Sequence, residues 1–240
     1  MSAKNHRNPP FRAEHLGSLL RPRKLLESRG EFDKAQTLSK AEQETLEDEG
    51  IKDIVSKQQE WGFRALTDGE YRRHMFWGYF WPTLEGMTEI YNPPLDMFRH
   101  YVPDMAAFIE EKAEPGESVI CTGKIKHSGK SSYEHEVKFL QDLLPKERWG
   151  EVKLTLAAPT WYHLRYREGK AYDKAVYASD DEYFADIAKA YQVELDLLYG
   201  LGIRNVTIDD PNFACKLTIN PSMLPISPKS FCSSPPPGRL

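Results

Sequence analysis

The sequence predicts an α/β fold built on a parallel sheet, because short apolar strands alternate with amphipathic helices along most of the chain. Two segments carry clear helix-start signals, since Ser39 is followed three residues later by Glu42, and Ser179 by Glu182. A serine and a glutamate at that spacing form the capping box that begins many helices. Parallel strands need helical crossovers, so either a closed barrel or an open doubly wound sheet fits this alternation.

The composition indicates a single globular domain. The chain has 240 residues, 40% of them hydrophobic, and a formal net charge of −4 with acidic and basic residues mixed. Such a surface has no basic field for a nucleic acid, and no apolar stretch has the length of a secretory signal or a bilayer span. The three cysteines are widely spaced, which is typical of reduced thiols. We expect a cytoplasmic protein with no nucleic-acid or membrane partner.

The first half of the chain predicts three strands and two helices. Pro22 suits the first turn of a short helix, and the helix that follows Ser39 ends at Gly62. Residues 71–116 contain the aromatic cluster 75–81 but no clean period, so we expect a long excursion beyond the sheet. The strands are expected at residues 11–15, 63–67 and 117–122.

The second half continues the alternation as far as residue 214. A helix is expected at residues 133–144, a strand at 151–157, a helix from Ser179 to Gly202 and a fifth strand at 204–208. The apolar face of the long helix is expected to consist of Phe184, Ile187, Tyr191, Leu195 and Leu198. Residues 1–10 read as a polar leader, 11–214 as the folded domain and 215–240 as a disordered tail rich in proline and serine.

Candidate site residues follow the expected strands, where the loops of a parallel α/β fold converge on one face. Gly17 and Ser18 could present backbone N–H groups and a hydroxyl to a substrate carboxylate. Glu70 and Asp209 would aim carboxylates into the same mouth, as a cradle for an ammonium group. Each of these motifs also suits an ordinary turn.

Aromatic and basic residues near the strand ends suggest a second group of contacts. Trp161 could stack on a planar heterocycle, although packing in the core or at its rim is the alternative. Arg72 and Arg73 could meet a polyanionic tail such as polyglutamate, although a solvated loop is the alternative.

Taken in order, several motifs resemble the methionine synthase-like proteins of the uroporphyrinogen decarboxylase and cobalamin-independent methionine synthase superfamily. The motifs lie at residues 12–22, 58–62, 67–73, 156–160 and 207–211, so the resemblance covers about residues 11–214. It implies a (β/α)₈ TIM barrel that is incomplete in this chain, with about five βα units.

The resemblance also implies a chemistry, in which a zinc-bound homocysteine thiolate attacks the methyl group of a methyltetrahydrofolate polyglutamate. Gly17 and Ser18 then match the loop that holds the homocysteine carboxylate, and Glu70 and Asp209 match the acids that hold its ammonium group. Trp161 falls near the family's pterin-stacking tryptophan. Arg72 and Arg73 are the candidates for the folate tail.

Two departures from the family pattern shape the expectations. The chain has Asp68-Gly69-Glu70 and Asp209-Asp210-Pro211 where the synthases usually have His-Gly-Glu and Asp-Glu-Pro, and the first change is typical of a shorter, single-domain branch. The zinc ligands have no counterpart after Pro211, and neither Cys215 nor Cys232 stands in such a motif.

Zinc deprotonates the thiol in this chemistry, so a chain without the zinc ligands should not turn over. We therefore expect a methyltransferase-type chain that is truncated or has an alternative C-terminus. One alternative is an inactive homologue that only binds an amino acid or a partner. Another is a decarboxylase-type relative that binds a carboxylated ring. An open arc of strands would also expose unpaired backbone edges, so we expect poor solubility or self-association.

Overall fold

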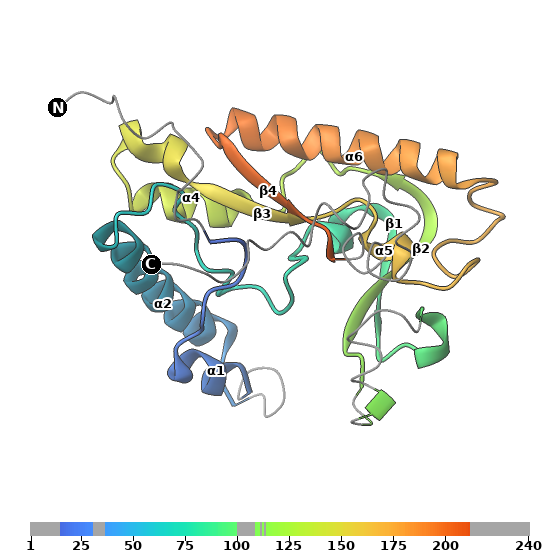
Figure 1. Ribbon diagram of the computed structural model, residues 1–240, viewed down its shortest axis with the longest axis horizontal. Helices are drawn as coiled ribbons and strands as arrows, with labels where there is room; N and C mark the ends of the chain where they lie inside the picture. Colours follow the sequence, from blue (N-terminus) through green and yellow to red (C-terminus); the bar gives the residue numbers. More distant parts are fainter. Residues whose placement is uncertain (1–14, 31–36, 100–108, 111, 113, 212–240) are drawn as a thin grey trace, which may run out of the picture.

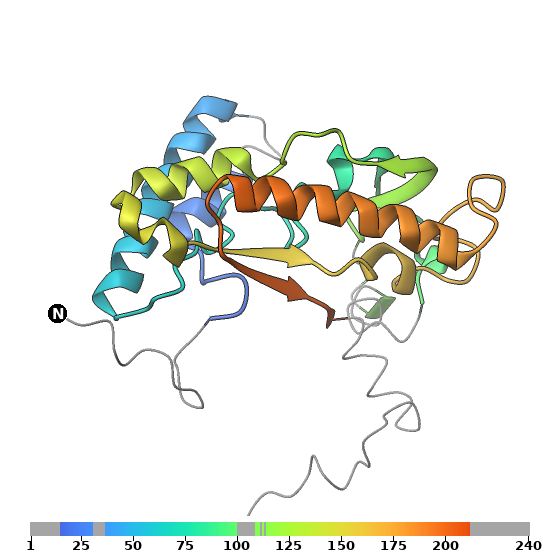
Figure 2. The same ribbon diagram turned by 90° about the horizontal axis from the view of Figure 1, so that it is seen from above.

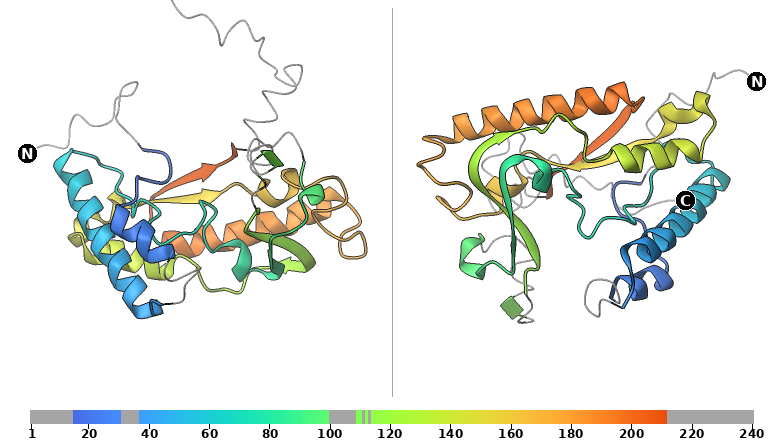
Figure 3. Two further views of the ribbon diagram at one scale, coloured as in Figure 1. Left: turned by 90° about the horizontal axis from the view of Figure 1, so that it is seen from below. Right: turned by 180° about the vertical axis from the view of Figure 1, so that it is seen from behind.

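The computed structural model describes residues 15–30, 37–99, 109–110, 112 and 114–211, and it has an α/β architecture (Figure 1). Two helices, α1 (Arg23–Gly30) and α2 (Lys40–Glu60), pack together at one end of the molecule. An antiparallel hairpin of β1 (Glu85–Tyr91) and β2 (Glu117–Lys126) lies toward the other end (Figure 3). Between them runs a parallel pair, β3 (Lys153–Ala157) and β4 (Asn205–Asp209).

The predicted helices are confirmed, and their ends follow local chemistry. The capping box at Ser39 is complete, since its hydroxyl accepts from Glu42 N at 3.3 Å and its own N–H donates to Glu42 Oε2 at 2.9 Å. Gly62 lies just past α2 with φ +79°, a conformation that favours glycine. The described residues also form α4 (Glu134–Asp142), α5 (Trp161–Leu164) and α6 (Asp180–Gly200), with 3₁₀ turns at Trp81–Thr83, Leu95–Met97 and Lys146–Glu151.

The parallel arrangement extends beyond β3 and β4 by one further segment. Leu66 forms a parallel bridge to Val152, in which Leu66 N donates to Glu151 O and Lys153 N donates to Leu66 O, both at 2.8 Å. The strand expected at residues 63–67 is therefore a single bridge. Most of the strand expected at residues 11–15 and the whole of the tail expected at residues 215–240 lie outside the described residues. Figure 2 shows α6 running along β3 and β4.

The prediction of a parallel strand at residues 117–122 was wrong, because β2 pairs antiparallel with β1. The pairing joins a strand to the segment that was expected to have no regular structure. Gly86 makes it possible: its φ is +81°, the register shifts beside it, and an added Cβ would lie 2.4 Å from the backbone oxygen of Lys124. The parallel pairings around β3 comprise the Leu66 bridge and β4, and a separate parallel bridge joins Cys121 to Tyr172, so the five βα units of the prediction are not shown.

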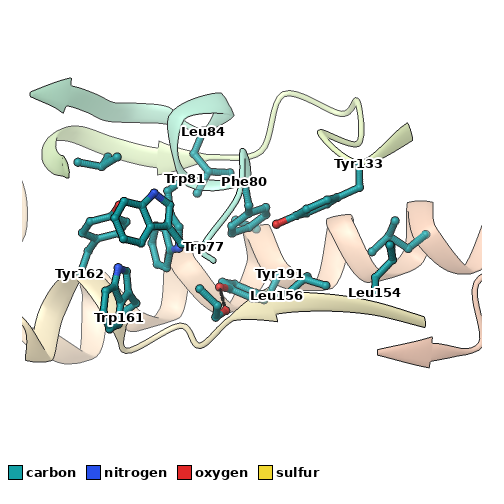
Figure 4. Close-up of a cluster of buried hydrophobic side chains, with 14 of the residues drawn as sticks. Trp77, Phe80, Trp81, Leu84, Tyr133, Leu154, Leu156, Trp161, Tyr162 and Tyr191 are labelled. Carbon is teal, nitrogen blue, oxygen red and sulfur yellow. Dashed lines mark hydrogen bonds between the residues drawn. The ribbon is translucent and has the colours of Figure 1, made fainter. Parts of the chain in front are cut away.

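The aromatic cluster at residues 75–81, which we call the aromatic excursion, contributes to the main core. Rings from the segment after the Glu70 turn belong to this core, and Figure 4 shows Trp77 and Trp81 beside Trp161 and Tyr162, with Phe80 near Tyr191. Trp81 is fully buried, and its ring lies 5.2 Å from that of Tyr162. The labelled members are Trp77, Phe80, Trp81, Leu84, Tyr133, Leu154, Leu156, Trp161, Tyr162 and Tyr191.

The buried face of α6 differs from the prediction by including a charged residue. Glu194 is fully buried, and its carboxylate accepts from Ser131 Oγ at 2.5 Å and lies 2.7 Å from His127 Nε2. Leu195, expected in the core, is 38% exposed. A hydrophobic pattern cannot reveal a buried carboxylate whose partners come from another element.

Within the described residues, none of the helices is long and apolar enough to cross a membrane.

Candidate functional site

The structure brings Gly17, Ser18, Glu70 and Asp209 together at one end of the parallel segments. The hydroxyl of Ser18 donates a hydrogen bond to Glu70 Oε2. A methyl group added at the Cα of Gly17 would lie 3.4 Å from Glu70 Oε1 and 3.7 Å from Asp209 Oδ2. We call this group of four residues the cradle. The proximity expected from the strand ends is therefore present, while the ligand that each residue holds stays a prediction.

Glu70 occupies an unusual backbone conformation at the tip of a tight turn. Its φ is +60°, in the left-handed region that residues with a Cβ rarely adopt, and the preceding Gly69 has φ +67°. Asp68 Oδ1 accepts the N–H of Glu70 at 2.9 Å, and Arg21 Nη2 donates to its carbonyl at 2.7 Å. Backbone conformations of this kind cluster at functional sites, where surrounding contacts hold them in place. The turn buries the Glu70 side chain and directs it toward Gly17.

Gln58 joins the segment at His15, which precedes Gly17 and Ser18, to Thr67, which precedes the Glu70 turn. Its side chain, fully buried in α2, accepts from Thr67 N at 3.1 Å and donates to Thr67 O at 2.8 Å. The same Oε1 atom lies 2.8 Å from His15 Nε2, and Lys153 Nζ donates to His15 O. Gln58 begins the motif at residues 58–62, but the sequence alone predicts no role for it. A buried amide that faces a strand end only becomes recognisable once the helix and strand are packed.

The electrostatics of the cradle favour a cation. Burial raises the pKa of the Asp209 carboxyl, and the nearby negative charge of Glu70 raises it further, while Arg73 and Lys153 act in the opposite direction. Two carboxylates around one space repel each other unless a positive group lies between them. An ammonium group placed there would interact with both. In this structure the Ser18 hydroxyl is directed at Glu70, so its predicted contact with a ligand carboxylate stays untested.

The predicted folate contacts occupy buried positions. Trp161 is 4% exposed, and its ring packs edge-on to Phe76 at 4.7 Å. Arg72 pairs with Asp48 and, at 3.6 Å, with Glu47. The exposed fractions of Arg72 and Arg73 are 7% and 1%, so the alternative of a solvated loop was wrong for both. Their role toward a folate stays a prediction, and in this structure both guanidinium groups bind carboxylates of the fold.

A cavity of about 690 Å³ is formed by other residues than those of the cradle. It is bordered by α2, the aromatic excursion, the hairpin and the start of α4, and Arg72, Tyr79 and Glu136 contribute to its wall. None of the four cradle residues lines it.

The described part of the chain offers no site that fits a zinc ion. Residues 15–30, 37–99, 109–110, 112 and 114–211 contain no group of three or more His, Cys, Asp or Glu that could hold a metal. Cys121 donates its thiol hydrogen to Gly123 O, and burial raises its pKa to about 11, which disfavours the thiolate that binds zinc. Cys215 and Cys232 lie outside the described residues.

Comparison with known proteins finds no family model that matches the chain. The uncharacterized protein YxjH of Bacillus subtilis strain 168 is 32% identical over 209 residues, which are 87% of this chain and 50% of that protein. The uncharacterized protein YxjG of the same organism is 31% identical over 214 residues, with 88% and 51% covered. The chain therefore spans about half the length of these curated relatives.

A solved structure that matches the chain carries a functional description. It is a candidate vitamin-B12-independent methionine synthase from Listeria monocytogenes, which matches with a TM-score of 0.58 and 27% identity over 85% of this chain and 53% of that protein. Both the sequence and the fold thus support the predicted relationship at the level of the synthase-like proteins. The chain is an α/β protein that is similar to about half of a candidate vitamin-B12-independent methionine synthase.

Proposed function

We propose that the chain is part of a methionine synthase-like methyltransferase and that its cradle binds the amino acid homocysteine. The observation that carries the proposal is the approach of Glu70 and Asp209 to the same point beside Gly17. Placing two partly desolvated carboxylates close together is unfavourable, so the arrangement suits a ligand that brings a positive charge. The similarity to the Listeria protein supports an amino-acid thiol as that ligand.

Each cradle residue then has a defined task. Glu70 and Asp209 bind the ligand ammonium group, and the absence of a side chain at Gly17 leaves room for the ligand beside them. The N–H groups of the Gly17–Ser18 loop hold the ligand carboxylate. Methyl transfer from a methyltetrahydrofolate is the reaction that the resemblance implies. The described residues contain no cluster that could hold a thiol-activating metal, so the proposal assigns them binding and orientation of the amino acid.

The proposal is tested by calorimetric titration of the purified chain with homocysteine and with 4-mercaptobutanoate, which lacks only the amino group. We expect homocysteine to bind and its des-amino analogue to bind at least tenfold more weakly, because a hydrogen bond to a charged group contributes roughly 1.5–3 kcal/mol. Glu70→Gln and Asp209→Asn should each weaken homocysteine binding.

Asp210→Asn is the matched control. Asp210 neighbours Asp209 in sequence, but its Oδ2 accepts from Thr160 Oγ1 at 3.1 Å. Equal binding of both ligands, or equal effects of the Asp209 and Asp210 substitutions, would contradict the proposed cradle.

A further inference from the structure

Thr155, on β3, connects the cradle to a buried arginine through a single hydroxyl group. Its Oγ1 lies 2.5 Å from Glu70 Oε1 and 2.9 Å from Arg73 Nη1. A guanidinium can only donate hydrogen bonds, so the hydroxyl accepts from Arg73 and its one hydrogen is directed to Glu70. With Ser18 donating to Oε2, both carboxylate oxygens of Glu70 accept a hydrogen bond from a hydroxyl.

Arg73 is held at several points and cannot swing out of this arrangement. Nη1 also donates to Thr155 O at 2.7 Å, and Nη2 donates to Glu136 Oε1 at 2.9 Å. Its guanidinium lies 5.2 Å from the centre of the Tyr133 ring. The planar fork thus spans β3 and α4, and Nη1 stands 3.7 Å from Glu70 Oε1.

Glu136 accepts the hydrogen bond from the other arm of the Arg73 guanidinium. It is 4% exposed on α4, and burial raises its pKa, with the negative charge of Asp68 adding to the effect and Arg73 opposing it. Burial likewise works against the charge of Arg73, but the surrounding acids, Glu136 first, raise its pKa above the ordinary value. The guanidinium therefore stays charged beside Glu70.

We propose that Thr155, Arg73 and Glu136 form a positioning relay that fixes the Glu70 carboxylate in the cradle, an inference that rests on the proposed function. The three residues act through Glu70 and bind no part of the ligand. Their contacts run from α4 through the arginine fork to the β3 hydroxyl, and so tie the strained Glu70 turn to two other elements. The relay gives Arg73 a role inside the protein instead of one toward a folate tail.

A pair of substitutions at Thr155 tests the relay with little change in shape. Thr155→Val is nearly isosteric but removes the hydroxyl, whereas Thr155→Ser retains it. We expect the valine variant to bind homocysteine roughly ten- to a hundredfold more weakly, since the lost bond is made to a carboxylate. The serine variant should stay within about threefold of the unmodified chain. Equal affinity of the valine variant and the unmodified chain would overturn the relay.

A second measurement separates the relay from the proposed function. Unfolding of Thr155→Val, Glu70→Gln and the double variant by urea gives a coupling between the two side chains without any ligand. We expect the double variant to lose clearly less stability than the two single losses combined, and additive losses would overturn the relay. Failure of the unmodified chain to bind homocysteine, with coupling present, would refute the proposed function and leave the positioning of Glu70 supported.

Discussion

Replacing Asp209 by asparagine should make the protein more stable and weaken its ligand binding at the same time. The Glu70 and Asp209 oxygens lie 3.4 and 3.7 Å from one point, so they are within about 7 Å of each other. At that distance two charges repel by about 0.6 kcal/mol in water and about 2.4 kcal/mol at an effective dielectric constant of about 20. Asp209 is only half-buried, and solvent screening reduces the effect to about 1 kcal/mol.

The pH dependence has a definite sign. The folded-state pKa of Asp209 is raised, so the folded chain binds more protons than the unfolded chain between the ordinary value of about 3.9 and the raised value. Ionised Asp209 therefore costs stability above that window and nothing below it. The advantage of Asp209→Asn should be present at neutral pH and disappear as the pH falls toward about 4.

Thermal unfolding followed by circular dichroism checks this prediction. For a chain of this size, 1 kcal/mol corresponds to a rise in Tm of about 2–4 °C at pH 7. Asp210→Asn is the control, and calorimetric titration of each variant with homocysteine measures the loss of binding. A lower Tm for Asp209→Asn, or a gain that persists at pH 4, would refute the electrostatic reasoning.

Three further substitutions test the parts of the fold that build the cradle. Gly17→Ala should change the free energy of unfolding by less than about 0.5 kcal/mol, yet weaken homocysteine binding by at least tenfold, because its methyl group would fill the space beside Glu70; calorimetry and a urea titration on one preparation decide this. Gln58→Leu should destabilise the chain by roughly 2–4 kcal/mol in urea, because both peptide groups of Thr67 lose a buried partner, and a loss below about 1 kcal/mol would show that the amide is dispensable. Gly86→Ala should destabilise by more than about 2 kcal/mol, because its Cβ would lie 2.4 Å from Lys124 O at a positive φ, whereas the solvent-facing Gly169→Ala, also at a positive φ, controls for backbone strain alone.

Sequence predicted the features that depend on neighbours along the chain. The caps at Ser39 and Ser179 lie within one turn of their helices, so their chemistry is visible in a short window. The gathering of Glu70 and Asp209 was also predictable, because the carboxyl ends of parallel strands meet on one side of a sheet. The role of Gln58, by contrast, depends on how α2 packs against the end of the Leu66 segment.

The remaining features depend on pairings between distant segments. The β1–β2 hairpin pairs residues that are 26 to 41 positions apart in sequence, from Tyr91 with Glu117 to Glu85 with Lys126, and its register shifts at Gly86. Nothing in the alternation of β1 distinguishes it from a loop. The positive charge of Arg73 favours a solvent-exposed position when the sequence is considered alone. Its burial becomes favourable only when Glu136 and Thr155 arrive from α4 and β3. Composition cannot reveal such a partnership, because the partners are far apart in sequence.

The position of β4 has a consequence for the way affinity should be measured. Among the described residues β4 pairs only with β3, and Val206 and Ile208 on it are 37% and 44% exposed. Asp209 ends this strand, so one of the two cradle acids stands on a border strand while the other is locked in the interior. If a second copy of the chain pairs with β4, it holds Asp209 more firmly in place. Homocysteine affinity should then rise with protein concentration in a dilution series.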